Sequence, residues 1–208
     1  MVVKSELKLI KSLQQKKCRI EHGLFVIEGK KTLEEVVKSQ MRLYKLFAVD
    51  PGDLDIGGHE VTQVTARELS QMSSLKNPNG YLGVFYIPEK VEKIDSDWVL
   101  VLDGVQDPGN LGTIIRLCDW FGINDIVCSK DTVDCYNPKV LQATMGSITR
   151  VNIQYRSLST FLGATELPIY GTFMDGDNVN TTTLPKKGIM IMGNEGKGVS
   201  NTVAELCS

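Results

Sequence analysis

The second half of the chain repeats short apolar runs that are separated by helix-length stretches. The clearest run, Trp98–Leu102, is apolar at every position, which is typical of a strand buried on both faces of a parallel sheet. Further runs lie at residues 126–128, 151–153, 168–170 and 189–192, with helix-like stretches near residues 111–121, 138–147 and 157–163. Strands that alternate with helices predict βαβ units around a parallel sheet, so the fold class is α/β.

Residues 1–88 predict a separate, smaller α/β domain. A basic amphipathic helix is expected near residues 4–16, and Thr65 with Glu68 three positions later is typical of a helix N-terminus. The other expected elements are strands near residues 24–27, 43–49 and 81–87 and a helix near residues 32–39. The polar stretch 89–97 predicts a linker, which leaves residues 98–208 as the second domain.

Charge is distributed unevenly between the two halves. Residues 1–94 carry 15 Lys and Arg against 12 Asp and Glu, a net of +3, whereas residues 95–208 carry 8 against 13, a net of -5. A polyanion such as RNA would be attracted to the first half. The alternative is a solvated helix face, because Lys4, Lys8 and Lys11 recur at helical spacing.

Composition excludes several classes of protein. The chain has 208 residues and is 42% hydrophobic, which predicts a folded protein, and no apolar run has the length of a membrane span. No secretory signal is recognised at the start, so a cytoplasmic protein is expected. Five cysteines without a C-x-x-C pair, and only two histidines, predict neither a disulfide framework nor a metal site.

Two loops follow buried strands and carry unusual residues. In the first, Pro108 and Gly109 form a turn, Asn110 is a candidate N-cap, and Arg116 lies further along the following helix. An alternative for Asn110 is a plain helix cap without a role in chemistry. The second loop, residues 193–200, has three glycines within six positions, which would let backbone groups approach a ligand closely. Ligands of parallel α/β folds bind beyond such strand ends.

The second loop matches neither of the common phosphate-binding patterns. A P-loop that starts at Gly193 would require Lys after Gly198, and residue 199 is Val. The dinucleotide fingerprint requires G-x-G-x-x-G, whereas the order here is G-x-x-G-x-G. Taken alone, the loop predicts a ligand that is held by backbone groups.

Taken together, the two loops resemble motifs one and two of the SpoU/TrmH family of RNA ribose 2′-O-methyltransferases, in the SPOUT superfamily. Residues 102–116 are similar to motif one and residues 193–200 to motif two. Between them, residues 136–147 resemble the family's N-P-K helix, and residues 24–29 resemble the entry to its ribosomal-protein-like substrate-binding domain. The resemblance therefore extends over essentially the whole chain.

The resemblance implies a fold and an activity. The second domain is expected to be a Rossmann-like sheet with a C-terminal trefoil knot, to bind S-adenosylmethionine without a metal, and to work as a homodimer. The expected reaction is methylation of a ribose 2′-hydroxyl in tRNA or rRNA. The family's third motif has no counterpart before Ser208. The resemblance therefore predicts either that the chain given lacks its C-terminal part, or that the cofactor site is half built.

The resemblance also assigns roles to individual residues. Arg116 would position the ribose and its phosphate, Asn110 would orient Arg116 or the substrate, and Glu195 would fix the active-site loop. The implied cofactor-binding residues are Thr172, Met192, Gly193, Asn194, Gly196 and Gly198. The basic residues expected to contact RNA are Lys16, Lys17, Arg19, Lys30 and Lys31.

Two other functions are compatible with parts of the sequence. A catalytically inactive RNA-binding protein of the same fold would bind RNA in a salt-dependent manner but would not bind S-adenosylmethionine. A nucleotide enzyme with a plain Rossmann sheet is disfavoured, because the second loop lacks both phosphate-binding patterns.

Overall fold

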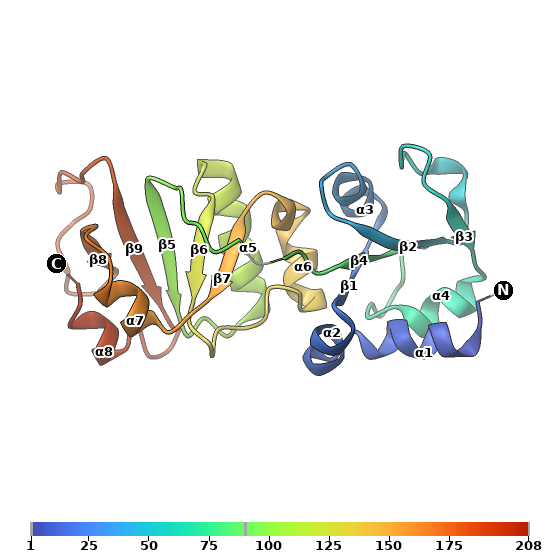
Figure 1. Ribbon diagram of the computed structural model, residues 1–208, viewed down its shortest axis with the longest axis horizontal. Coiled ribbons are helices and arrows are strands. Elements are labelled where there is room, and N and C mark those ends of the chain that lie inside the picture. The colour runs from blue at the N-terminus through green and yellow to red at the C-terminus, as the bar shows by residue number, and fades with distance from the viewer. Residues whose placement is uncertain (1, 90, 208) are drawn as a thin grey trace. The chain divides into compact units, whose positions relative to one another are not determined.

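A computed structural model describes residues 2–89 and 91–207, and it divides into two compact units (Figure 1). Residues 1, 90 and 208, which belong to the predicted first domain, linker and second domain, lie outside the described residues. One unit comprises residues 2–89 together with residues 136–149, and the other comprises residues 91–135 and 150–207. Within the described residues, no helix has both the length and the apolar character that a membrane crossing requires.

The first unit is built on a four-stranded mixed sheet. Its strands are β1 (Leu24–Glu28), β2 (Leu43–Ala48), β3 (Val61–Gln63) and β4 (Tyr81–Tyr86). Its helices are α1 (Lys4–Ser12), α2 (Lys16–His22), α3 (Lys30–Val37), α4 (Ala66–Met72) and α6 (Pro138–Thr144). The strand order is β1-β4-β2-β3, in which β4 is antiparallel to both neighbours and β3 is parallel to β2. Short 3₁₀ helices lie at Pro51–Asp53 and Ser147–Thr149.

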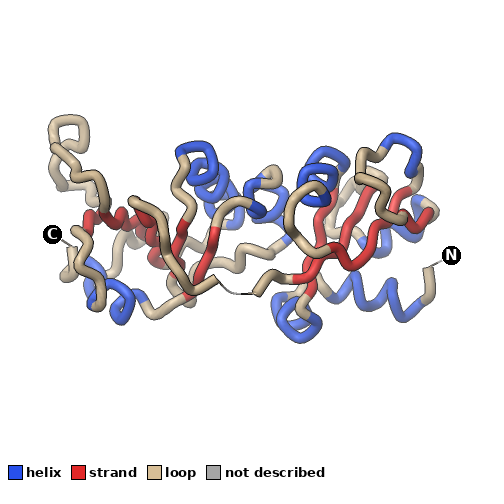
Figure 2. Tube along the Cα trace, turned by 45° about the horizontal axis from the view of Figure 1, so that its top comes forward, coloured by secondary structure: helices blue, strands red, loops and turns tan. Residues whose placement is uncertain are grey.

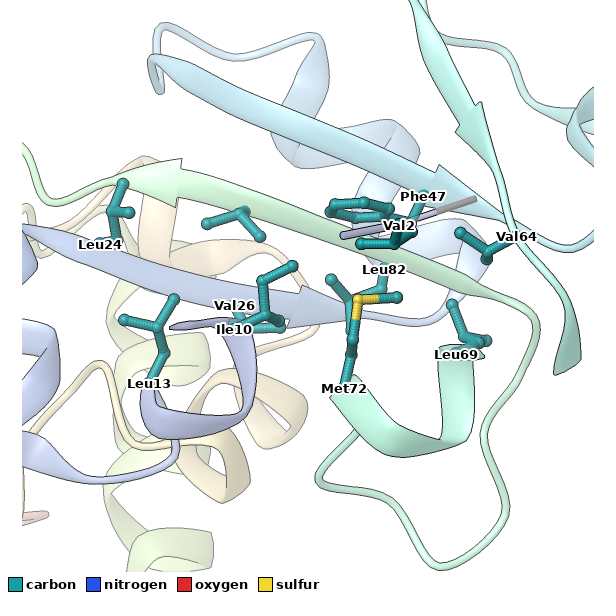
Figure 3. Close-up of a cluster of buried hydrophobic side chains, with 11 residues drawn as sticks. Val2, Ile10, Leu13, Leu24, Val26, Phe47, Val64, Leu69, Met72 and Leu82 are labelled. Carbon is teal, nitrogen blue, oxygen red and sulfur yellow. The ribbon is translucent and has the colours of Figure 1, made fainter. Parts of the chain in front are cut away.

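Helices cover both faces of this sheet. Helices α1 and α4 pack on one face, where Ile10 and Met72 meet Phe47 and Leu82 in a buried cluster (Figure 3). On the other face, the side chain of Leu33 in α3 lies against Gly83, and the ring of Phe25 in β1 lies 4.8 Å from that of Tyr136. Burial of apolar side chains on both faces is therefore what stabilises the unit.

The predicted single helix over residues 4–16 is two helices in the structure. Helix α1 ends at Ser12 and α2 begins at Lys16. The guanidinium of Arg19 is buried and donates hydrogen bonds to the carbonyl oxygens of Leu13 and Gln14, at 2.8 and 2.9 Å. Carbonyl groups after the last turn of a helix have no partner within it, so Arg19 stabilises this break.

The second unit contains a five-stranded parallel sheet, which confirms the predicted α/β class. Figure 2 shows where the strands and helices of the chain lie. Its strands are β5 (Trp98–Asp103), β6 (Asp125–Cys128), β7 (Asn152–Tyr155), β8 (Ile169–Gly171) and β9 (Gly188–Gly193). Its helices are α5 (Pro108–Phe121), α7 (Leu158–Gly163) and α8 (Asn201–Ala204). The strand order is β7-β6-β5-β9-β8. The order reverses between β5 and β9, the position at which parallel α/β folds bind their ligands.

The predicted linker is anchored to the second unit over much of its length. The carboxylate of Asp125 accepts hydrogen bonds from the backbone N–H groups of Asp95 and Ser96 and from the Ser96 hydroxyl, at 3.1, 3.0 and 2.6 Å. Burial alone would raise the pKa of Asp125, but these bonds and one from Asn152 lower it below its usual range. The ionised carboxylate thus fixes residues 95–96 against the start of β6.

Candidate functional site

The two loops that the sequence singled out lie side by side at the carboxyl ends of β5 and β9. Asp103 and Gly193, the last residues of these strands, are paired in register. The side-chain amide of Asn194 donates to the carbonyl oxygen of Gly104 at 2.7 Å, and the N–H of Ser200 donates to Asp103 Oδ2 at 2.8 Å. Segments about 90 positions apart in the sequence therefore form one site at the switch point of the sheet.

The loop after β9 is closed on itself around Asn194. Backbone hydrogen bonds of 2.9 and 2.8 Å join Asn194 to Gly198 in both directions. The Oδ1 atom of Asn194 accepts from the N–H groups of Gly196 and Lys197 at 2.9 and 3.0 Å. Since its Nδ2 donates to Gly104, both ends of this amide are engaged by backbone groups. Asn194 therefore shapes the loop, a role beyond the cofactor contact predicted for it.

The three glycines of this loop are not equivalent. A Cβ atom at Gly193 would lie 2.1 Å from the carbonyl carbon of Gly198 and 2.2 Å from the nitrogen of Val199, so a side chain there is sterically excluded. Gly198 has φ +70°, a conformation that residues with a side chain rarely adopt. Neither constraint applies to Gly196, because the nearest atom to a Cβ there would be 3.7 Å away and its φ is not positive.

The helix after the first loop begins differently from the prediction. Asp107, not Asn110, is the N-cap of α5, and its side chain accepts from the N–H of Asn110 at 2.8 Å. Pro108 occupies the first helical position, where its missing N–H and fixed φ suit a helix start. The side chain of Asn110 is therefore available for another partner.

A hydrogen bond between Asn110 and Glu195 is the third contact between the two loops. The Nδ2 atom of Asn110 donates to Glu195 Oε1 at 3.0 Å. This bond lowers the pKa of Glu195, and backbone N–H groups, including that of Asp107, lower it further, so the carboxylate is ionised near neutral pH. The sequence predicted functional roles for both residues, and the structure brings them into direct contact.

Arg116 lies on the exposed face of α5. Within residues 2–89 and 91–207, no side chain forms a hydrogen bond or an ion pair with its guanidinium. The same helix exposes large apolar side chains near its C-terminal end: Leu117 is 50% exposed, Trp120 83% and Phe121 72%. An unpaired guanidinium has five N–H donors for an incoming anionic ligand.

Two other predicted cofactor residues lie beside the end of β9. Thr172 follows β8, and its N–H and hydroxyl both donate to the carbonyl oxygen of Ile191, at 3.0 and 3.1 Å. Met192, the neighbouring residue of β9, is 37% exposed. Both residues therefore border the edge of the sheet at which the two loops meet.

The basic residues predicted to contact RNA divide into two groups. Lys16, Lys17 and Lys31 are exposed, and Lys30 is half-buried. Arg19 was predicted incorrectly as a surface contact: it is 2% exposed, and its guanidinium stabilises the break between α1 and α2. A buried guanidinium that is bonded to backbone carbonyls cannot reach a phosphate.

Sequence reasoning missed two residues that build the site. Asp103 accepts from Ser200, and Ser129, after β6, accepts from the N–H of Gly104 at 2.9 Å through its hydroxyl. Their position at the carboxyl ends of buried strands was a signal that could have identified them, because polar residues there face the ligand edge of a parallel sheet.

If the chain has the methyltransferase activity that the resemblance implies, Asn110→Ala is expected to lower its rate about tenfold or more and to change the melting temperature little, because the lost bond is exposed. The variant removes the bond to Glu195 but leaves the N-cap of α5 intact, because the cap is Asp107. Turnover and thermal melting of the purified protein would measure the two effects.

Asp107→Ala provides the matched control, with a cost of about 1 kcal/mol in stability from the lost cap. The variants Asn110→Ala and Glu195→Ala should be non-additive in turnover when combined, since each removes the same hydrogen bond. Additive effects would show that the two side chains act separately.

Comparison with known proteins connects both units to families. Residues 97–208 match the SpoU rRNA Methylase family, and residues 4–83 match the MRM3-like substrate binding domain. The 23S rRNA (guanosine(2553)-2'-O)-methyltransferase RlmP of Bacillus subtilis is 32% identical over 204 residues, which are 94% of this chain and 81% of that protein. Mitochondrial rRNA methyltransferase 3 of Xenopus laevis is 32% identical over 161 residues, which are 70% of this chain and 38% of that protein.

Solved structures agree with these matches. A TrmH-family protein from Porphyromonas gingivalis superposes with a TM-score of 0.89 at 30% identity, covering 100% of this chain and 87% of that one. An AdoMet-bound rRNA methyltransferase from Sinorhizobium meliloti superposes with a TM-score of 0.84 at 26% identity, covering 100% and 84%. The family match over more than half of the chain and the similarity to the B. subtilis protein lead to one conclusion: this chain belongs to the SpoU rRNA methylase family.

Proposed function

We propose that this protein is an S-adenosylmethionine-dependent methyltransferase that methylates a ribose 2′-hydroxyl in rRNA or tRNA. The observation that carries the proposal is the pair of loops joined at the switch point of the sheet. Arg116, which has no hydrogen-bond or ion-pair partner among the described residues, lies on the helix that begins there. The relative from B. subtilis is named as a 2′-O-methyltransferase of 23S rRNA, and the relative from S. meliloti is AdoMet-bound.

The residues at the end of β9 fit this cofactor in their chemistry. At Gly193 the closed loop of residues 193–198 brings backbone atoms of Gly198 and Val199 close together, and the adjacent Met192 is 37% exposed. Backbone N–H and C=O groups would bind the polar edges of an adenosine, and Thr172 would border it. When bound, S-adenosylmethionine supplies a methyl group on a sulfonium, which is a good leaving group.

Arg116 acts on the RNA acceptor by binding and positioning. A guanidinium is not deprotonated in proteins, so Arg116 does not serve as the base. Its fork of donors suits a phosphate beside the reacting ribose and would hold the 2′-hydroxyl toward the methyl group. When the 2′-hydroxyl is methylated, its proton would leave to an acceptor, for which the phosphate held by Arg116 is our candidate.

Asn110 and Glu195 support this arrangement. Their hydrogen bond fixes the start of α5, and with it the position of Arg116, against the loop after β9. Positioning of this kind is a credible main contribution, because a reactive methyl donor needs little further activation.

Assembly and topology extend the proposal. The protein works as a homodimer. This part of the proposal is supported by three exposed apolar side chains on α5, those of Leu117, Trp120 and Phe121. A trefoil knot at the C-terminal end of the second unit would involve the segment after β9, the strand that enters the sheet between β5 and β8.

Calorimetry and methyl incorporation test this function together. S-adenosylmethionine is expected to bind the whole chain, and labelled methyl groups should enter rRNA or tRNA. After alkaline hydrolysis the label should remain in uncleaved dinucleotides, because a methylated 2′-oxygen cannot attack the adjacent phosphodiester. Salt-dependent RNA binding without cofactor binding would instead identify the inactive RNA-binding protein.

A further inference from the structure

Two tyrosines and an arginine form a cluster at one end of the sheet in the first unit. The rings of Tyr44 in β2 and Tyr86 in β4 lie 5.7 Å apart at an angle of 78°, edge to face. The guanidinium carbon of Arg42 lies 4.3 Å from the centre of the Tyr86 ring. Arg42 is exposed and Tyr44 is 39% exposed, so the cluster faces solvent.

A β-bulge places Tyr44 in this cluster. Leu43 pairs with Phe85 and Lys45 pairs with Val84, so Tyr44 is an extra residue between two successive pairs of the β2–β4 ladder. A bulge redirects a side chain from the regular alternation of a strand, and bulges are frequent next to functional sites. Here the bulge brings the ring of Tyr44 beside the ring of Tyr86.

The three side chains of this cluster are not equally accessible to a ligand. Tyr86 is partly buried against the core of the unit, and Arg42 lies over its ring. Lys45, the neighbour of Tyr44, forms an ion pair with Glu6 at 2.7 Å. The accessible groups are therefore one aromatic ring and one guanidinium, and a planar ring beside a cation is suited to an unstacked nucleobase with its phosphate.

We propose that Tyr44, Tyr86 and Arg42 form a stacking platform for an unpaired base of the RNA substrate. This inference rests on the proposed function, since it presupposes an RNA ligand. Charge supports RNA over a basic or apolar partner surface, because residues 1–94 carry a net charge of +3 and an exposed arginine belongs to the platform. The exposed ring beside that arginine favours a nucleobase over an acidic protein surface. Stacking gives affinity with little sequence preference, because every base has an aromatic face.

The platform is distinct from the lysines predicted at the start of α3. In the β1–β4 ladder, Leu24 pairs with Tyr86, whereas Glu28, just before Lys30, pairs with Leu82. Four residues of strand separate the two ends, about 13 Å at the usual rise. The first unit would thus contact RNA at both ends of this sheet, with Lys30 and Lys31 at one end and the platform at the other.

Fluorescence anisotropy with a labelled single-stranded oligoadenylate of about 12 nucleotides tests the platform on the whole chain at several salt concentrations. Tyr44→Ala should weaken binding about 5- to 100-fold and leave the slope of log Kd against log salt unchanged, because no charge is lost. Tyr44→Phe should bind like the wild type. Arg42→Gln should weaken binding and reduce the slope by about 0.7, the value for one phosphate contact to a single strand.

Tyr44→Leu is the matched control for folding, since it keeps an apolar side chain at the bulge but has no planar ring. It should melt like the wild type and bind RNA like Tyr44→Ala. If the wild type binds and methylates RNA while Tyr44→Ala and Tyr44→Leu bind it equally well, the platform is refuted and the proposed function stands. A wild type that binds S-adenosylmethionine but no RNA would refute both.

Discussion

Arg116→Ala is expected to abolish methyl transfer to RNA and to leave the fold intact. The side chain is exposed on α5, and its removal breaks no hydrogen bond or ion pair with the described residues. Its loss removes the cation that would hold the reacting ribose and its phosphate. Groups that position or stabilise the reacting atoms contribute about 100-fold or more to the rate, and we expect a loss of at least that size.

Single-turnover methylation, calorimetry with S-adenosylmethionine and thermal melting would separate the effects of this substitution. Cofactor affinity and melting temperature should match those of the wild type, so that the loss lies in turnover. Arg116→Lys should recover only a small part of the rate, because an ammonium lacks the planar fork of donors. An Arg116→Ala protein with wild-type turnover would exclude this residue from the reaction.

Gly193→Ala is expected to eliminate cofactor binding and to destabilise the second unit. The new Cβ atom would lie 2.1 Å from the carbonyl carbon of Gly198 and 2.2 Å from the nitrogen of Val199. Backbone atoms cannot move away as the end of a side chain can, so the closed loop must open. Its hydrogen bonds between Asn194 and Gly198 would then be lost. Overpacking of this kind costs about 1–3 kcal/mol.

Gly196→Ala provides the control within the same loop. The nearest atom to a Cβ there is 3.7 Å away, so this variant should melt like the wild type and retain the S-adenosylmethionine binding that Gly193→Ala loses. Calorimetry and thermal melting of both variants would show whether the effect depends on the position. Equal losses at the two positions would mean that the loop requires flexibility in general rather than close backbone approach at Gly193.

Much of the parallel sheet could be predicted from the sequence, because buried strands are continuous apolar runs. All five strands of the second unit lie where such runs were identified, with ends shifted by one or two residues. Strand β3 has only three residues and none of them is buried, so it forms no apolar run and was not predicted. The N-cap at Asp107 was missed in favour of Asn110, although Pro108 marks the first helical position and so indicates the residue before it as the cap.

The contacts that assemble the site could not be predicted in the same way. The residues of the site were found by resemblance, but the bonds from Asn194 to Gly104 and from Asn110 to Glu195 join segments separated by 90 and 85 positions. A local pattern has no information about such partners. Arg19 was placed incorrectly because a buried arginine bonded to carbonyls has the same sequence pattern as a surface one.

The division of the first unit into two stretches has a consequence for any attempt to dissect this protein. Helix α6 follows β6 in the chain, yet it packs with β1, where Tyr136 lies against Phe25. Proteolysis within the linker would leave this helix on the C-terminal fragment. The N-terminal fragment would then expose an aromatic surface of β1 to water. Such a fragment would be prone to self-association, so the RNA binding that we propose for the first unit is best measured with the uncut polypeptide.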